Sequence, residues 1–108
     1  MMKYNKLVRD NIPDIILSNG EKPITRILND EEYINELERK LLEEYNEVLA
    51  SSGSDRIEEL ADMLEVISSL ARIEGKTLDD VNKVATLKRQ KRGSFDKRIY
   101  LEGVEDDK

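Results

Sequence analysis

Two stretches with helical periodicity, joined by the short polar turn Ser51-Ser52-Gly53-Ser54, constrain the fold of this chain most. At about 100° of rotation per residue, each stretch gathers its apolar residues on one face. The face of the first stretch consists of Tyr33, Ile34, Leu37, Leu41, Tyr45 and Val48. The broader face of the second consists of Leu60, Met63, Leu64, Val66, Ile67, Leu70 and Ala71. Because the connection is short, we expect the two helices to pack as an antiparallel hairpin.

Capping and stop signals mark the ends of four expected helices. Asn29 and Glu32 have the spacing of a capping box, and Ser54 or Asp55 is expected to cap the helix after the turn. The expected helices begin near Pro13, Asn29, Asp55 and Thr77 and end near Asn19, Ala50, Glu74 and Arg92.

Two short runs, 24–28 and 98–101, are rich in β-branched or aromatic residues and predict a small two-stranded sheet. The fold class is therefore mainly α, a helical hairpin with further helices in a bundle and a small β piece. Since the apolar face of the second helix is too wide for one partner, we expect self-association, as a dimer or tetramer, to complete the bundle. Residues 1–101 form the expected domain, and 102–108 form an acidic tail.

Composition excludes several functions. The 108 residues contain no cysteine and no histidine, so thiolate chemistry and the commonest general base are absent. The net charge of −6 argues against binding to nucleic acid or anionic membrane as the main role. No run approaches the length of a membrane span, and the amino terminus lacks the apolar core of a signal peptide. We expect a soluble, cytoplasmic protein.

Several carboxylates lie on the apolar faces of the two helices. Glu44 projects into the middle of the first face, with Glu47 at its border, and Glu59 lies inside the second face, with Asp62 at its edge. An ionised carboxylate costs several kcal/mol to bury unless it is compensated. Interhelical ion pairs compensate too little, because residues 31–65 contain twelve acids and three bases. The pattern predicts a metal site.

The donor atoms indicate which metal. A set of oxygen ligands without histidine or cysteine suits Mg²⁺, Mn²⁺ or Ca²⁺ rather than Zn²⁺. Mg²⁺ commonly binds a few carboxylates together with phosphates of a substrate. The expected cofactor is therefore Mg²⁺, with Mn²⁺ as a substitute, and the expected substrate is phosphorylated.

A basic region offers cations for such phosphates. Residues 83–98 contain seven bases and one acid, and Lys88 and Arg92 share a helix face. Lys40, Lys88, Lys91 and Arg92 are the candidate substrate-binding residues. A solvated basic helix end that complements the helix dipole explains the same pattern equally well for the last three. Arg9 and Asp10 fit either a role in the site or a buried pair that ties the N-terminal segment to the body.

The chain resembles the all-α nucleoside triphosphate pyrophosphohydrolases, which include the MazG-like proteins. The resemblance rests on the run from Lys40 to Glu47, on Glu58-Glu59-Leu60-Ala61-Asp62, and on two flanking motifs. The flanks, residues 6–13 and 92–99, are similar to a subgroup described as house-cleaning pyrophosphatases.

The resemblance implies an Mg²⁺-dependent hydrolysis of a nucleoside triphosphate to a monophosphate and pyrophosphate. It implies Glu44, Glu47, Glu59 and Asp62 as metal ligands. One of these carboxylates, or Glu43 beside them, would accept the proton of the attacking water, so the candidate catalytic residues are Glu43, Glu44 and Glu47. Two alternatives stay open: a non-catalytic helical association module with the same fold, and phosphoribosyl-ATP hydrolysis.

Overall fold

The structure, a computed structural model, describes residues 2–106 of the chain. It contains four helices, α1 (Ile12–Ser18), α2 (Asp30–Leu49), α3 (Gly53–Ile73) and α4 (Leu78–Arg92). The chain divides into two compact units, one ending at Leu78 and the other beginning at Asp79. The prediction of a mainly α fold is confirmed.

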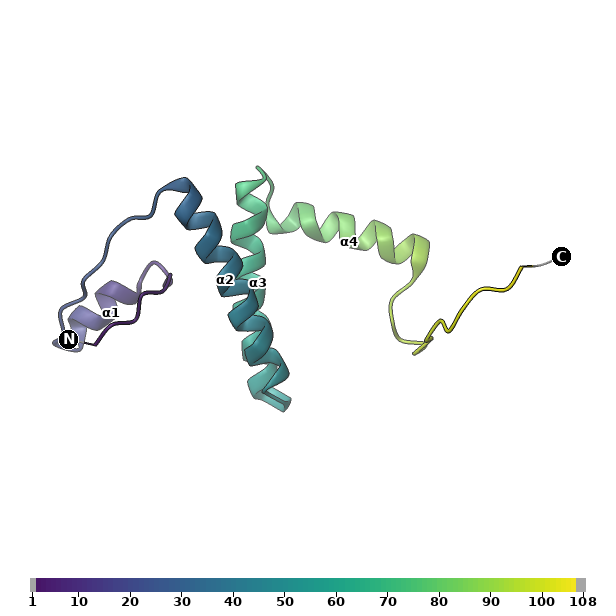
Figure 1. The fold of residues 1–108 in the computed structure, drawn as a ribbon, viewed down its shortest axis with the longest axis horizontal. Helices are drawn as coiled ribbons and strands as arrows, with labels where there is room; N and C mark the ends of the chain where they lie inside the picture. Colours follow the sequence, from purple (N-terminus) through teal and green to yellow (C-terminus); the bar gives the residue numbers. More distant parts are fainter. Residues whose placement is uncertain (1, 107–108) are drawn as a thin grey trace. The chain divides into compact units, whose positions relative to one another are not determined.

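Helices α2 and α3 form the expected antiparallel hairpin and pack against each other, most closely toward the turn that joins them (Figure 1). The capping box of α2 is present, because Asn29 Oδ1 accepts a hydrogen bond from Glu32 N at 2.9 Å and Glu32 Oε1 accepts one from Asn29 N at 3.3 Å. Arg26 adds two hydrogen bonds to the Glu32 carboxylate. These contacts fix the start of α2.

The turn between α2 and α3 is shorter than predicted. Helix α3 begins at Gly53 rather than near Asp55, and its N-cap residue is Ser52, whose side chain makes no capping hydrogen bond. Gly53 has a φ of +59°, a backbone conformation that residues with a Cβ rarely adopt. The tighter turn places the end of α2 directly beside the start of α3.

The predicted two-stranded sheet is wrong: neither 24–28 nor 98–101 is a strand, and the described residues contain no strand at all. Ile24 and Ile27 are 76% and 95% exposed, so no neighbouring backbone covers this run. Arg98 has a φ of +58°, which interrupts the second run at its first residue. A β-branched composition favours extended backbone, but a strand also requires a partner that supplies the hydrogen-bond ladder.

The core of the hairpin is small. Its buried apolar residues are Leu37 from α2 and Val66 and Ala71 from α3. Helix α1 packs on neither α2 nor α3 within the described residues, so the packed helices of this unit are a pair rather than a larger bundle.

Of the predicted acidic tail, 107–108 lie outside the described residues, and 102–106 contain neither helix nor strand.

Candidate metal centre

Helical phase places Glu44 in the core of the hairpin. Glu44 lies seven residues, about two turns, after Leu37, so it occupies the same face of α2. Leu37 is 3% exposed and Glu44 is 9% exposed. A carboxylate is therefore buried where the periodicity of α2 calls for an apolar side chain.

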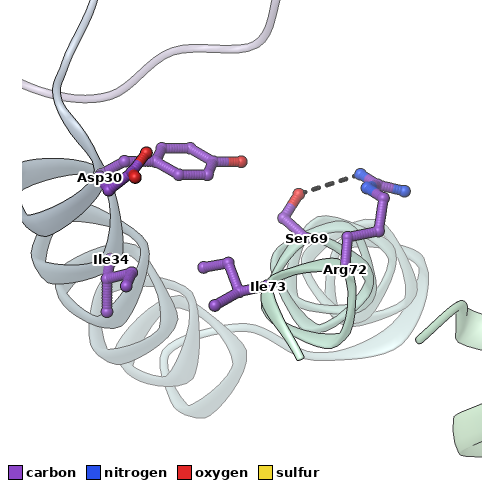
Figure 2. A pocket seen from close by; sticks show the side chains of 6 residues that line it. Asp30, Ile34, Ser69, Arg72 and Ile73 are labelled. Carbon is purple, nitrogen blue, oxygen red and sulfur yellow. Dashed lines mark hydrogen bonds between the residues drawn. The ribbon is translucent and has the colours of Figure 1, made fainter. Parts of the chain in front are cut away.

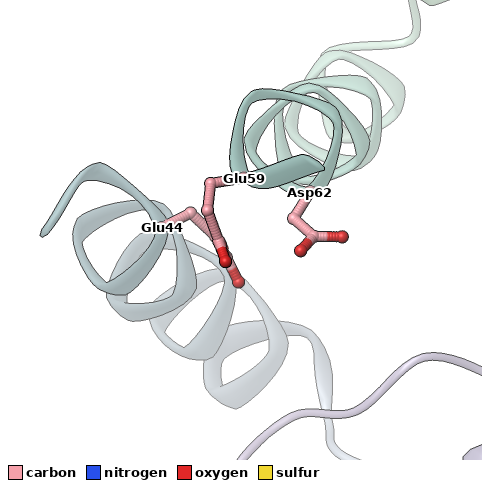
Figure 3. A group of neighbouring side chains, drawn as sticks. All are labelled: Glu44, Glu59 and Asp62. Carbon is pink, nitrogen blue, oxygen red and sulfur yellow. The ribbon is translucent and has the colours of Figure 1, made fainter. Parts of the chain in front are cut away.

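The short turn brings two acids of α3 to the same level. Oxygen atoms of Glu44, Glu59 and Asp62 all lie within 4.8 Å of one another. Figure 3 shows Glu44 reaching from α2 toward Glu59 and Asp62, which project from α3 into the same space. We call these three residues the acid triad. Glu59 and Asp62 are half-buried, so one side of the triad remains open to solvent.

The triad is electrostatically strained. Burial, reinforced by the charge of Asp62, raises the pKa of Glu44 above its usual value, and the charges of Glu43 and Glu59 raise it further by smaller amounts. Lys40 opposes this effect. Within residues 2–106, no hydrogen bond or ion pair holds the Glu44 carboxylate. The donor set fits a hard divalent cation such as Mg²⁺ or Mn²⁺, which would replace the missing positive partner.

The other predicted catalytic residues lie outside the triad. Glu47 and Glu43 are exposed, and Glu43 pairs with Lys40 at 3.6 Å, where the Lys40 side chain is 20% exposed. Glu47 is not among the acids that converge. Its assignment as a metal ligand stays a prediction.

The predicted phosphate-binding bases Lys88, Lys91 and Arg92 are exposed on the last turns of α4. They belong to the unit that begins at Asp79, whereas the triad belongs to the unit that ends at Leu78. Their role in substrate binding also stays a prediction.

Arg9 reaches the triad directly. Its Nη2 donates a hydrogen bond to Asp62 Oδ1 at 2.6 Å, and the two side chains are 58% and 44% exposed. Arg9 therefore ties the N-terminal segment to α3, as one of the two alternatives for Arg9 and Asp10 has it, but through Asp62 and in a pair that is open to solvent rather than buried. No periodicity relates two residues that are 53 positions apart, so the sequence carries no signal for this contact.

A shallow pocket lies at the other end of the hairpin. It has a volume of about 400 Å³ and is lined by Asp30, Tyr33, Ile34, Ser69, Arg72 and Ile73 (Figure 2). Arg72 donates hydrogen bonds to Ser68 Oγ at 3.1 Å and Ser69 Oγ at 3.2 Å. Asp30 and Glu44 are fourteen residues apart on α2, or about 21 Å along the helix axis. The pocket and the triad are therefore separate sites. The sequence predicted the three acids of the triad, together with Glu47, and did not predict the pocket.

Comparison with known proteins assigns no family. No family model and no solved structure matches the chain. A 50-residue region is 44% identical to an uncharacterised protein of Mycolicibacterium smegmatis, covering 46% of this chain and 51% of that protein. The match thus spans about half the length of this relative. In addition, none of the helices in residues 2–106 is both long and apolar enough to cross a membrane.

Proposed function

We propose that this protein hydrolyses a nucleoside triphosphate to a nucleoside monophosphate and pyrophosphate, with Mg²⁺ bound at the acid triad. The observation that carries the proposal is Glu44, which is nine-tenths buried, has no partner and faces two further carboxylates within 4.8 Å. Carboxylates this close together destabilise one another, and a bound cation would offset that cost. The resemblance of the motifs around Glu44 and Asp62 to the all-α pyrophosphohydrolases supports the choice of reaction.

Each side chain of the proposed site has a role in binding the cation, in binding the phosphates or in accepting a proton. Glu44, Glu59 and Asp62 would hold the cation. The charge of Lys40 lowers the pKa of Glu44 and so favours its ionised form. When bound, Mg²⁺ would act as a Lewis acid, which would offset the negative charge of the phosphates and lower the pKa of a water molecule. Glu43 and Glu47, both exposed, are the acids left to accept a proton from the attacking water. Lys88, Lys91 and Arg92 are proposed as further phosphate ligands.

The direct test is a panel of canonical and damaged nucleoside triphosphates, with phosphoribosyl-ATP included. We expect the purified protein to release pyrophosphate from at least one of them when Mg²⁺ or Mn²⁺ is present. Chelation of the cation by EDTA should stop the release, and excess Mg²⁺ should restore it. Absence of release across the whole panel would contradict the proposed reaction and favour the association module.

The association module has its own support, because the hairpin leaves large apolar side chains exposed near its turn. They are Leu42, Tyr45 and Leu49 on α2 and Ile57, Leu60 and Leu64 on α3, each at least 44% exposed. Two copies that bury these faces against each other would complete a four-helix arrangement. Self-association therefore accompanies the proposed enzyme as well as its alternative.

We expect sedimentation analysis to give a dimer or tetramer at micromolar concentration. Leu42→Glu with Leu64→Glu should shift the protein toward the monomer, because each places a charge on the face that is buried on association. Leu17→Glu is the matched control, since Leu17 is 56% exposed on α1, away from these faces. A wild-type protein that stays monomeric would contradict self-association through these faces.

A further inference from the structure

The N-terminal segment delivers a positive charge to the acid triad. The guanidinium of Arg9 is bound to Asp62 at 2.6 Å, yet more than half of the Arg9 side chain is exposed. A single exposed ion pair is weak, so this guanidinium can exchange its partner at little cost. Lys40 is less free to move, because its side chain is 20% exposed and pairs with Glu43.

A divalent cation at the triad would weaken the ion pair between Arg9 and Asp62. If Asp62 helped to hold a cation, its carboxylate would attract the guanidinium less, and the two positive groups would repel each other. A polyphosphate between them relieves this repulsion. Its oxygens can bind the cation and can also accept the paired hydrogen bonds that a planar guanidinium donates.

We propose that Arg9 is a substrate-binding residue. Its guanidinium binds Asp62 when the site is empty, and it binds the phosphates of the substrate instead when a cation occupies the triad. This inference depends on the proposed function, since it requires the cation at Glu44, Glu59 and Asp62. It gives the N-terminal segment a part in the reaction, and of the two roles that the sequence left open for Arg9 it selects the one in the site.

The proposal predicts effects of opposite sign for Arg9→Ala. The variant should bind Mn²⁺ alone about two- to fivefold more tightly, because the competitor for Asp62 is gone. It should bind the Mn²⁺ complex of inorganic tripolyphosphate about tenfold more weakly, because the charged hydrogen bonds to phosphate are lost. Both affinities are measured by titration calorimetry on the full chain. Tripolyphosphate carries no base, so the result does not depend on base preference.

Two variants serve as controls. Arg26→Ala removes another exposed arginine of the N-terminal segment, one that pairs with Glu32 at 2.8 Å, and it should leave both affinities unchanged. Arg9→Lys keeps the charge and should recover part of the tripolyphosphate affinity, which excludes unfolding as the cause of the loss.

The outcomes separate the two proposals. If the wild type binds Mn²⁺ but Arg9→Ala changes neither affinity, or changes both in the same direction, the role of Arg9 is refuted and the metal site stands. If the wild type binds no Mn²⁺, the proposed function fails, and the role of Arg9 fails with it.

Discussion

Glu44→Gln is expected to lower the rate of pyrophosphate release by about 100-fold or more, because it removes the innermost carboxylate of the acid triad. The same change should abolish Mn²⁺ binding measured by calorimetry. Asp62→Asn is expected to have a similar effect on the rate. Neither substitution should unfold the protein, since each is close to isosteric.

Glu44→Gln should also stabilise the cation-free protein. Burial raises the pKa of Glu44, so the folded protein holds this proton to a higher pH than the unfolded chain does. The stability that this group contributes is complete below its unfolded pKa, and it is lost as the pH rises through the raised folded pKa. Without metal, Glu44→Gln should therefore melt at a higher temperature than the wild type at neutral pH. This difference in melting temperature should shrink as the pH falls.

Glu38→Gln is the matched control for both measurements, because Glu38 is an exposed acid on the same helix. It should leave the activity, the Mn²⁺ affinity and the melting temperature close to those of the wild type. Full activity in both Glu44→Gln and Asp62→Asn would rule out the triad as the catalytic centre.

Leu37→Ala is expected to destabilise the protein by about 2–5 kcal/mol, the range for a buried leucine that leaves a cavity. Leu37 is 3% exposed and is the most buried apolar residue of the described part. Because small domains are stable by only about 5–15 kcal/mol, this one change should remove a large share of the total. The measurement is urea unfolding, followed by far-UV circular dichroism at one fixed protein concentration.

Leu17→Ala tests whether burial is the cause. Leu17 has the same side chain but is 56% exposed on α1, so its loss should change the free energy of unfolding by no more than about 0.5 kcal/mol. Equal effects of the two substitutions would mean that the hairpin core does not dominate the stability.

Helical periodicity predicted much of the fold and the centre of the candidate site. The apolar spacing and the capping box at Asn29 predicted α2 to within a residue at its end, because these signals act within one or two helical turns. The burial of Glu44 followed from its phase relative to Leu37. By contrast, the strands at 24–28 and 98–101 were predicted wrongly, since composition shows that a run can extend but not that a partner lies beside it.

The sequence by itself determined that the chain is helical, that α2 and α3 form a hairpin, and that Glu44 lies on an apolar face, because each of these depends on neighbours close in the chain. The sequence also predicted that Glu44, Glu59 and Asp62 lie together, but only the tertiary structure decided that Glu47 stays exposed outside this group, since this depends on the length of the turn and the register of the two helices. It alone also paired Arg9 with Asp62. Contacts between distant residues arise from the path of the whole backbone, which no local pattern encodes.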